Sequence, residues 1–132
     1  MKLLYVASFV LLVCGAMGDI KKETLRAHKK YRKMHGVAKL KWDSTVAAFA
    51  QKWCEGLAKS DKFEHSEGSG YGENLYKSWG SGSDGAGTNA VKSWYDEIKD
   101  YDFNNPGWSM KTGHFTQVHS QKGNSIILSV LF

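Results

Sequence analysis

His65, His114, Glu73 and Glu97 are of residue types that can bind a metal ion or act as acid and base, although the sequence holds further histidines and glutamates. Neutral imidazole nitrogens are preferred zinc ligands, and carboxylates or a water molecule can complete the coordination shell. Two carboxylates can also serve as the acid and the nucleophile of a glycosidase. The spacing alone indicates no site, because the sequence contains neither an HExxH nor a CxxC motif. Judged by spacing only, His65 is a loop histidine bonded to the backbone and Glu97 is a solvated helix flank.

Helical periodicity predicts the first elements that position these side chains. Between residues 23 and 35, apolar or aromatic side chains recur every three positions, and Gly36 follows as a C-terminal cap. A second amphipathic helix begins after an N-cap at Asp43 or Ser44. Both helices precede His65 in the chain.

The remaining segments alternate between loop, helix and strand character. Residues 60–89 are rich in Ser, Gly and Asp, which predicts a long functional loop. A third helix, capped by Thr88 or Asn89, follows the loop, and its apolar face includes Trp94. Residues 114–118 and 125–132 are strand-like, and the second is a continuous apolar run typical of a buried central strand.

The first eighteen residues predict a secretory signal peptide. Lys2 precedes an apolar run of about a dozen residues, and small residues follow at positions 16 and 18. A membrane anchor is the alternative, but a spanning helix needs about twenty apolar residues. We therefore expect an export signal at 1–18 and one domain at 19–132, which is long enough for a single modest core.

Charge and cysteine content bound the function further. The formal net charge of +5 suits contact with anionic surfaces, either phospholipid headgroups or acidic glycans, although most surface charge only keeps a protein soluble. No RNA- or DNA-binding signature accompanies the basic residues, so we expect no nucleic-acid partner. Cys54 is the one cysteine outside the predicted signal, so we expect it to be partly buried or to form an intermolecular bond.

Several motifs occur in an order that resembles the CAP superfamily (cysteine-rich secretory, antigen 5 and pathogenesis-related proteins). The stretch WYDEIKDYDFNNPGWSMKTGHF and the lack of paired cysteines resemble the Golgi-associated pathogenesis-related branch. That branch normally has no signal peptide, so the export signal here is a departure. The motifs are LRAHKKYRKMHGVAKLKWD at 25–43, AAFAQKWCEGLA at 47–58, FEHS at 63–66, GENLY at 72–76, AVKSWYDEIKDYDF at 90–103 and GHFTQV at 113–118.

The resemblance implies an α+β fold, a three-layer α-β-α sandwich with a central antiparallel sheet. In the family, GHFTQV continues into two further strands, whereas residues 119–132 here match nothing in that pattern. We therefore expect the domain to be truncated after about residue 118 and the sheet to be incomplete at its C-terminal end.

Residues 119–132, the C-terminal tail, therefore affect the expected stability of the domain. We expect 125–132 to pair beside 114–118, with 122–124 as the turn. One strand cannot replace two, so we expect a marginally stable or aggregation-prone protein.

For function, the resemblance implies that His65, Glu73, Glu97 and His114 face one another across a cleft. We expect a weak divalent-metal site there, with zinc held by His65 and His114. A metal-dependent hydrolase, protease or glycosidase, using these four residues is the alternative.

A binding role is the preferred hypothesis, because no nucleophile with a supporting motif is present. An aromatic turn resembles the loop of family members that bind sterols or membranes, and we expect it to bind lipids or sterols, unless Tyr101 and Phe103 only cover the end of the third helix. The setting is extracellular, such as defence, venom or host contact, and a protein partner or a homodimer is a further expectation. The residues of this turn are Tyr101, Phe103, Pro106 and Trp108.

Overall fold

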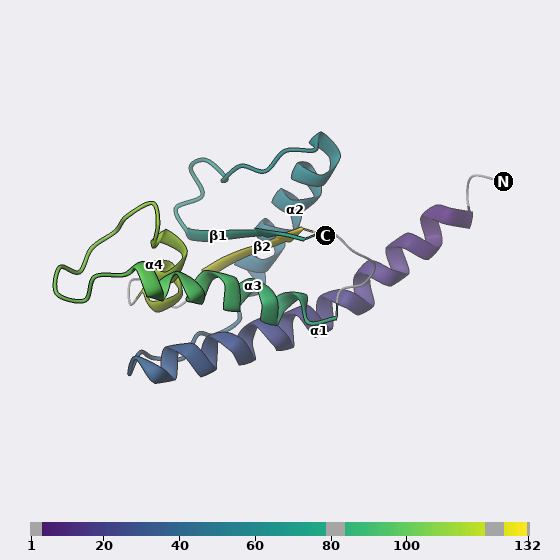
Figure 1. Cartoon of the computed structure of the whole chain (residues 1–132). Helices are drawn as coiled ribbons and strands as arrows, with labels where there is room; N and C mark the ends of the chain where they lie inside the picture. The colour runs from purple at the N-terminus through teal and green to yellow at the C-terminus, as the bar shows by residue number, and fades with distance from the viewer. Residues whose placement is uncertain (1–3, 79–83, 121–125, 132) are drawn as a thin grey trace.

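The computed structural model describes residues 4–78, 84–120 and 126–131, with side chains for 18–78 and 84–120 (Figure 1). Among these residues, no helix combines the length and the apolar content that a membrane span requires. In chain order the elements are α1 (Leu4–Met34), α2 (Ser44–Ser60), β1 (Gly72–Lys77), α3 (Ala86–Tyr95), the 3-10 helix η1 (Asp96–Asp100), α4 (Gly113–His119) and β2 (Ile126–Leu131).

The two helices predicted first form with the expected caps. α1 ends at Met34, and Gly36 takes a left-handed φ of 66°, a conformation that costs glycine little. Asp43 caps α2, because its Oδ1 accepts hydrogen bonds from the amides of Thr45 (2.8 Å) and Val46 (3.1 Å). Cys54, on α2, is half-buried, as predicted.

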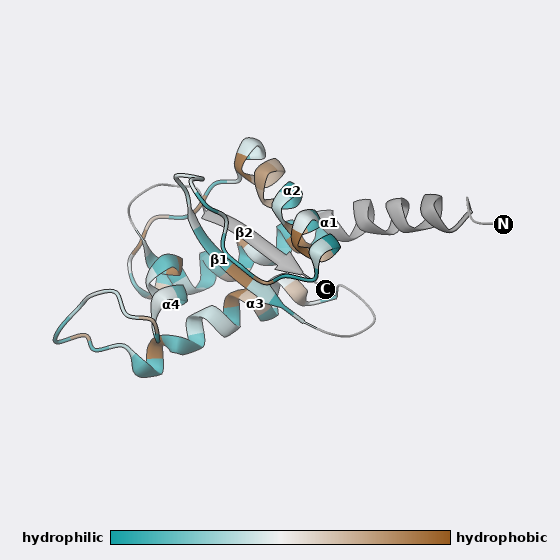
Figure 2. Cartoon of the chain, turned by 90° about the horizontal axis from the view of Figure 1, so that it is seen from above, coloured by the Kyte–Doolittle hydropathy of each residue, from teal (hydrophilic) through white to brown (hydrophobic). Residues whose placement is uncertain are grey.

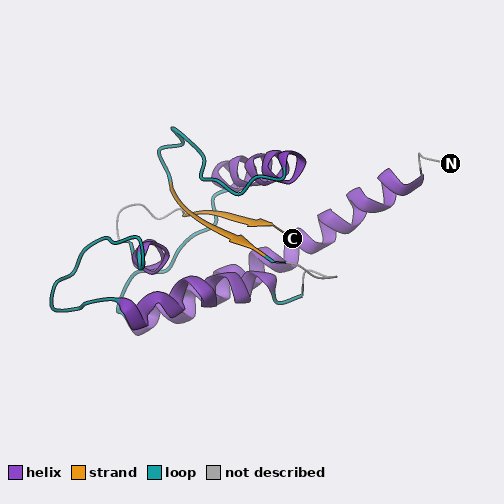
Figure 3. Cartoon of the chain, turned by 45° about the horizontal axis from the view of Figure 1, so that its top comes forward, coloured by secondary structure: helices purple, strands orange, loops and turns teal. Residues whose placement is uncertain are grey.

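β1 and β2 pair in parallel, with Gly72 opposite Ile126 and Lys77 opposite Leu131 (Figure 3). The prediction of an antiparallel sheet is wrong for this pair. The chain between the two strands passes through α3, η1 and α4, and such a helical crossover returns the second strand in the direction of the first. Figures 1 and 3 show α2 on one side of the strand pair and α3 with α1 on the other.

Two further predictions are corrected by the structure. Residues 114–118 are not a strand: they lie in α4, whose buried Phe115 and Val118 are three positions apart. The spacing of Phe115 and Val118 fits a helix rather than the alternation of a strand, and Glu97 supports the helix start by accepting the Phe115 amide at 3.0 Å. The β2 strand therefore pairs with β1, which lies inside the predicted loop 60–89. The predicted turn at 122–124 falls outside the described residues.

The third helix also differs in its bounds. It begins at Ala86, after Gly85, rather than at Thr88 or Asn89. The reason is a side chain from another element: Glu23 of α1 accepts hydrogen bonds from the amides of Gly85 and Gly87, both at 3.0 Å. These amides belong to the helix start, where no intrahelical partner exists.

The core lies where α1, α3 and α4 meet. Its buried side chains include Ala27, Ala90, Val91, Trp94 and Val118. α3 lies very close to α1 at Gly87: a Cβ there would lie 2.6 Å from Thr24 Oγ1 and 2.8 Å from the carbonyl oxygen of Ile20.

A buried arginine ties this core together. Arg32 of α1 is 1% exposed and donates from Nε to the Ala38 carbonyl (2.7 Å). Its Nη1 donates to the carbonyls of Val118 (2.7 Å) and Ser120 (3.0 Å) at the end of α4. A helix C-terminus leaves such carbonyls without intrahelical partners and favours a nearby cation. Arg32 therefore links α1 to α4.

Candidate functional site

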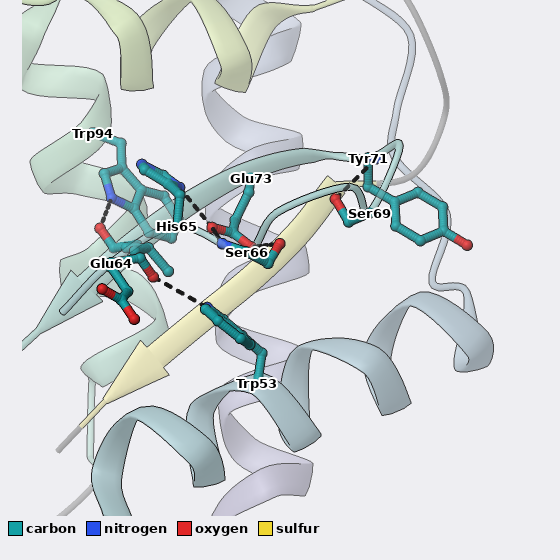
Figure 4. A network of polar contacts seen from close by, with 9 residues as sticks. Trp53, Glu64, His65, Ser66, Ser69, Tyr71, Glu73 and Trp94 are labelled. Carbon is teal, nitrogen blue, oxygen red and sulfur yellow. Dashed lines mark hydrogen bonds and ion pairs between the residues drawn. The ribbon is translucent and has the colours of Figure 1, made fainter. Parts of the chain in front are cut away.

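The first His–Glu pair lies where the chain enters β1 (Figure 4). His65 Nδ1 and Glu73 Oε1 are 2.6 Å apart. Ser66 donates to the same carboxylate from its amide (3.1 Å) and from its hydroxyl (2.6 Å). The Glu73 side chain is only 6% exposed, whereas that of His65 is 60% exposed. Glu73 is thus a buried anchor that holds an accessible imidazole.

The second pair lies where η1 meets α4. His114 Nδ1 and Glu97 Oε1 are 2.6 Å apart, and the other oxygen of Glu97 accepts the Phe115 amide. Glu97 therefore does two things: it satisfies an amide at the start of α4, and it orients the His114 ring. The solvated helix flank that spacing suggested for Glu97 is replaced by this doubly bonded position.

Trp94 and Asn74 connect the second pair to β1. The Trp94 ring stacks on His114 with centroids 6.4 Å apart, and its Nε1 donates to the Leu75 carbonyl at 2.9 Å. Asn74, next to Glu73, donates from its side chain to the His114 carbonyl at 3.1 Å. The structure therefore brings the four predicted residues together as two pairs. Within the described part of the chain, no three His, Cys, Asp or Glu side chains group as a metal site would require.

The geometry limits what each pair can do chemically. In a neutral imidazole whose Nδ1 donates to a carboxylate, Nε2 holds the lone pair, so Nε2 is the atom that could bind a ligand. A carboxylate that fixes the tautomer in this way is typical of the outer shell of metal sites. Ser66 donates to Glu73 and not to a histidine, so it lacks the base that activates a nucleophile.

The aromatic turn lies apart from these pairs, in the segment between η1 and α4 that projects from the rest of the chain (Figures 1 and 2). Tyr101, Phe103 and Pro106 line a cavity of about 290 Å³. Trp108 does not line it and is 74% exposed. The structure therefore divides the four predicted residues into three that line the cavity and one that points into solvent.

Other residues of this region escaped sequence reasoning. Met110 is 89% exposed on the same segment, and its position two residues after Trp108 was the available signal. The cavity is completed by His35, Phe115, Thr116 and His119. His119 follows the last recognisable motif, so no pattern marked it. Burial lowers the pKa of His119, and its Nδ1 lies 2.9 Å from the Phe115 carbonyl.

A buried histidine of α1 is electrostatically the most perturbed group. His28 is 1% exposed, and burial lowers its pKa to about 4. Its Nδ1 lies 2.9 Å from the Thr24 carbonyl, while Nε2 is buried and has no partner among the described residues. Protonation would put a second hydrogen on Nε2 with nothing to accept it, so the neutral ring is favoured.

Comparison with known families settles the relationship. A sequence profile of the cysteine-rich secretory protein (CAP) family matches residues 25–126. The chain belongs to this family. The match includes both His–Glu pairs, the aromatic segment and Arg32.

Relatives of this CAP-family chain come from animals, plants and fungi. It is 42% identical over 97 residues to human Golgi-associated plant pathogenesis-related protein 1, covering 71% of this chain and 61% of the relative. It is 39% identical over 100 residues to pathogenesis-related protein 1 of Arabidopsis thaliana, covering 76% and 60%. It is 42% identical over 97 residues to secreted protein RBT4 of Candida albicans, covering 73% and 25%. The predicted family is thus confirmed, and the chain spans less than two thirds of each of these relatives.

Proposed function

We propose that this CAP-family protein is a secreted, non-catalytic lipid- or sterol-binding protein whose contact surface is segment 101–110. One observation carries the proposal: Phe103, Trp108 and Met110 are 60%, 74% and 89% exposed on one projecting segment. Exposed apolar groups gathered in this way mark interaction sites, whereas scattered ones need no explanation. Trp and Tyr also suit the boundary between water and lipid, because each has an apolar body and a polar tip.

The base of the segment is already ordered, which lowers the entropy lost on binding. The Tyr101 ring lies 5.0 Å from Phe115 of α4 and 4.9 Å from Phe103, measured between centroids. Asp102 Oδ1 accepts the amides of Asn104 (2.8 Å) and Asn105 (3.3 Å), which fixes the turn. Tyr101 thus anchors the segment to α4, as the alternative of a helix-end cover requires, but Trp108 and Met110 stay 74% and 89% exposed.

We also propose the fold, the export signal and the location that the sequence predicts. The complete fold is a three-layer α-β-α sandwich, which the helices on both sides of the strand pair support. A signal peptide at 1–18 and an extracellular location agree with a relative named as a secreted protein, although another is named as Golgi-associated. A protein partner, a homodimer or an anionic membrane surface stays a prediction.

A divalent-metal site at His65 and His114 is a secondary proposal. Its support is that each Nδ1 is bound to a glutamate, which leaves Nε2 as the coordinating atom. Zinc would supply Lewis acidity there. Among the described residues, no observation favours the hydrolase alternative over binding.

Co-sedimentation with phosphatidylcholine vesicles, with and without cholesterol, tests the lipid proposal. The double variant Trp108→Ser/Met110→Ser removes two large apolar contacts, so we expect binding to weaken by roughly tenfold or more. The matched control is Trp42→Ser/Phe63→Ser, because these side chains are 41% and 51% exposed elsewhere in the molecule. Equal binding by wild type and the first variant, or an equal loss in the control, would refute the assignment of the surface.

A further inference from the structure

One face of α1 carries basic side chains in line. Exposed residues Lys22, Arg26, Lys29 and Lys33 occupy positions i, i+4, i+7 and i+11. This spacing returns each residue to the same side of a helix, over a length of about 16 Å. We call these four residues the basic stripe. The opposite face of α1, with Ala27, is buried in the core, so the stripe points away from the domain.

In the described part of α1, the stripe residues differ from the other three cations, Lys21, Lys30 and Arg32, each of which has a partner. Within the described residues the lysines that form salt bridges are Lys62, Lys77 and Lys92, and none of the four stripe residues does. Two neighbouring lysines of α1 are held by aromatic rings: Lys21 lies 4.7 Å from the Trp42 ring centroid, and Lys30 lies 5.3 Å from that of Tyr31. Within the described part of α1, the stripe is what remains once Lys21, Lys30 and the buried Arg32 are set aside.

The acidic residue nearest to the stripe in sequence is unable to neutralise it. Glu23 follows Lys22, but both of its oxygens accept amides of α3, from Gly85 and Gly87. Like charges three and four positions apart repel and weaken a helix by a few tenths of a kcal/mol per pair. An anionic ligand along the stripe would remove this repulsion.

We propose that the basic stripe binds a sulfated polysaccharide chain. Four cations in a straight row match a linear ligand with repeated anionic groups, and Arg26 can bind a sulfate with two parallel hydrogen bonds. A helix that lies on a membrane also needs apolar side chains along the margin of its basic face. Among the described residues of α1 the exposed large apolar side chain is Met34, at the end of the helix. The stripe is therefore charge alone, which favours an acidic polysaccharide over an anionic membrane, the two kinds of partner that the net charge suggested.

Heparin, as a defined sulfated polysaccharide, is the probe. The variant Lys22→Gln/Arg26→Gln/Lys29→Gln/Lys33→Gln is expected to bind heparin less tightly by roughly fivefold for each charge removed. Wild-type binding is expected to weaken steeply as NaCl rises and to disappear for chemically desulfated heparin. The control Lys39→Gln/Lys41→Gln/Lys52→Gln/Lys59→Gln removes the same charge from exposed residues outside α1 and is expected to bind almost as wild type.

Three outcomes would overturn the proposal. The first is equal affinity of wild type and the stripe variant for heparin. The second is an equal loss in the control, which would reduce the effect to net charge. The third is tighter binding to phosphatidylserine vesicles than to heparin with dependence on the same four residues, which would make the stripe a membrane contact. The variant Trp108→Ser/Met110→Ser should keep full heparin affinity, because it leaves α1 unchanged.

Discussion

Two regions depart from the usual rule that apolar side chains are buried and polar ones exposed. One is the core where α1, α3 and α4 meet, and the other is segment 101–110. The first buries polar groups, His28 and Arg32, each 1% exposed. The second exposes apolar groups, Trp108 and Met110. Buried polar groups are costly unless they are bonded, and Arg32 is bonded three times. The first region therefore contributes to stability, whereas the second leaves large apolar side chains exposed to solvent.

Removing Arg32 should give the largest effect on stability. Arg32→Ala leaves the carbonyls of Ala38, Val118 and Ser120 without their donor, and we expect a loss of about 4 kcal/mol in the free energy of unfolding. Arg32→Lys keeps the charge but loses the planar guanidinium group, so its free energy of unfolding should lie between those of the wild type and Arg32→Ala. Urea unfolding measures both. Lys29→Ala, an exposed neighbour, should change stability by less than about 0.5 kcal/mol, and a similar loss there would refute this role of Arg32.

Acid should produce the next largest effect. The unfolded chain protonates His28 near pH 6.5, whereas the folded chain does so only near pH 4. The unfolded state therefore holds more protons between these values, and stability falls as the pH falls from 6.5 to 4. The shifted pKa of His28 accounts for a loss of up to about 3 kcal/mol in the free energy of unfolding over this pH range. His119, whose pKa burial also lowers, acts in the same direction.

Unfolding free energies at pH 7 and pH 4.5 measure this dependence. His28→Gln should reduce the difference between the two pH values, even if the variant is less stable at both. An identical pH dependence in wild type and His28→Gln would show that His28 is not its source.

A single methyl group tests the close approach of α3 to α1. Gly87→Ala places a Cβ 2.6 Å from Thr24 Oγ1 and 2.8 Å from a backbone carbonyl, which should cost about 2 kcal/mol. Gly56→Ala on α2 meets nothing within 4 Å and should stabilise the protein by up to about 1 kcal/mol. The opposite order of thermal midpoints would mean that the two helices are not tightly packed.

Substitution in segment 101–110 should have the smallest effect on stability. Trp108→Ser is expected to shift the free energy of unfolding by less than about 0.5 kcal/mol, because the side chain is 74% exposed. Thermal unfolding checks this. A loss above 1 kcal/mol would place Trp108 with the core rather than with the binding surface.

Sequence reasoning succeeded where the signal is local. The caps at Asp43 and Gly36 act within a few residues of themselves, and both form as predicted. It failed where a distant partner decides. Arg32 looks like a surface charge in sequence, and its acceptor on Val118 lies 86 residues away. β1 forms because β2 pairs with it from the far end of the chain.

The candidate site shows the same division. The family resemblance indicated the four residues His65, Glu73, Glu97 and His114, but not which histidine bonds to which glutamate. The strand predicted at 114–118 is a helix, and the i, i+3 spacing of Phe115 and Val118 was the signal that favoured it. The marginal stability expected from the tail stays a prediction.

The proposed contact of segment 101–110 with lipid can be tested by locating Trp108 when the protein is bound to vesicles. Brominated phosphatidylcholine quenches tryptophan emission only at short range, so vesicles that contain it can be titrated into wild type and Trp108→Phe. Phe keeps an apolar contact, so both proteins should bind. We expect brominated lipid to quench the tryptophan emission of the wild type strongly and that of Trp108→Phe much more weakly. Equal quenching of the two at equal binding would contradict it, because the lipid would then lie against another part of the molecule.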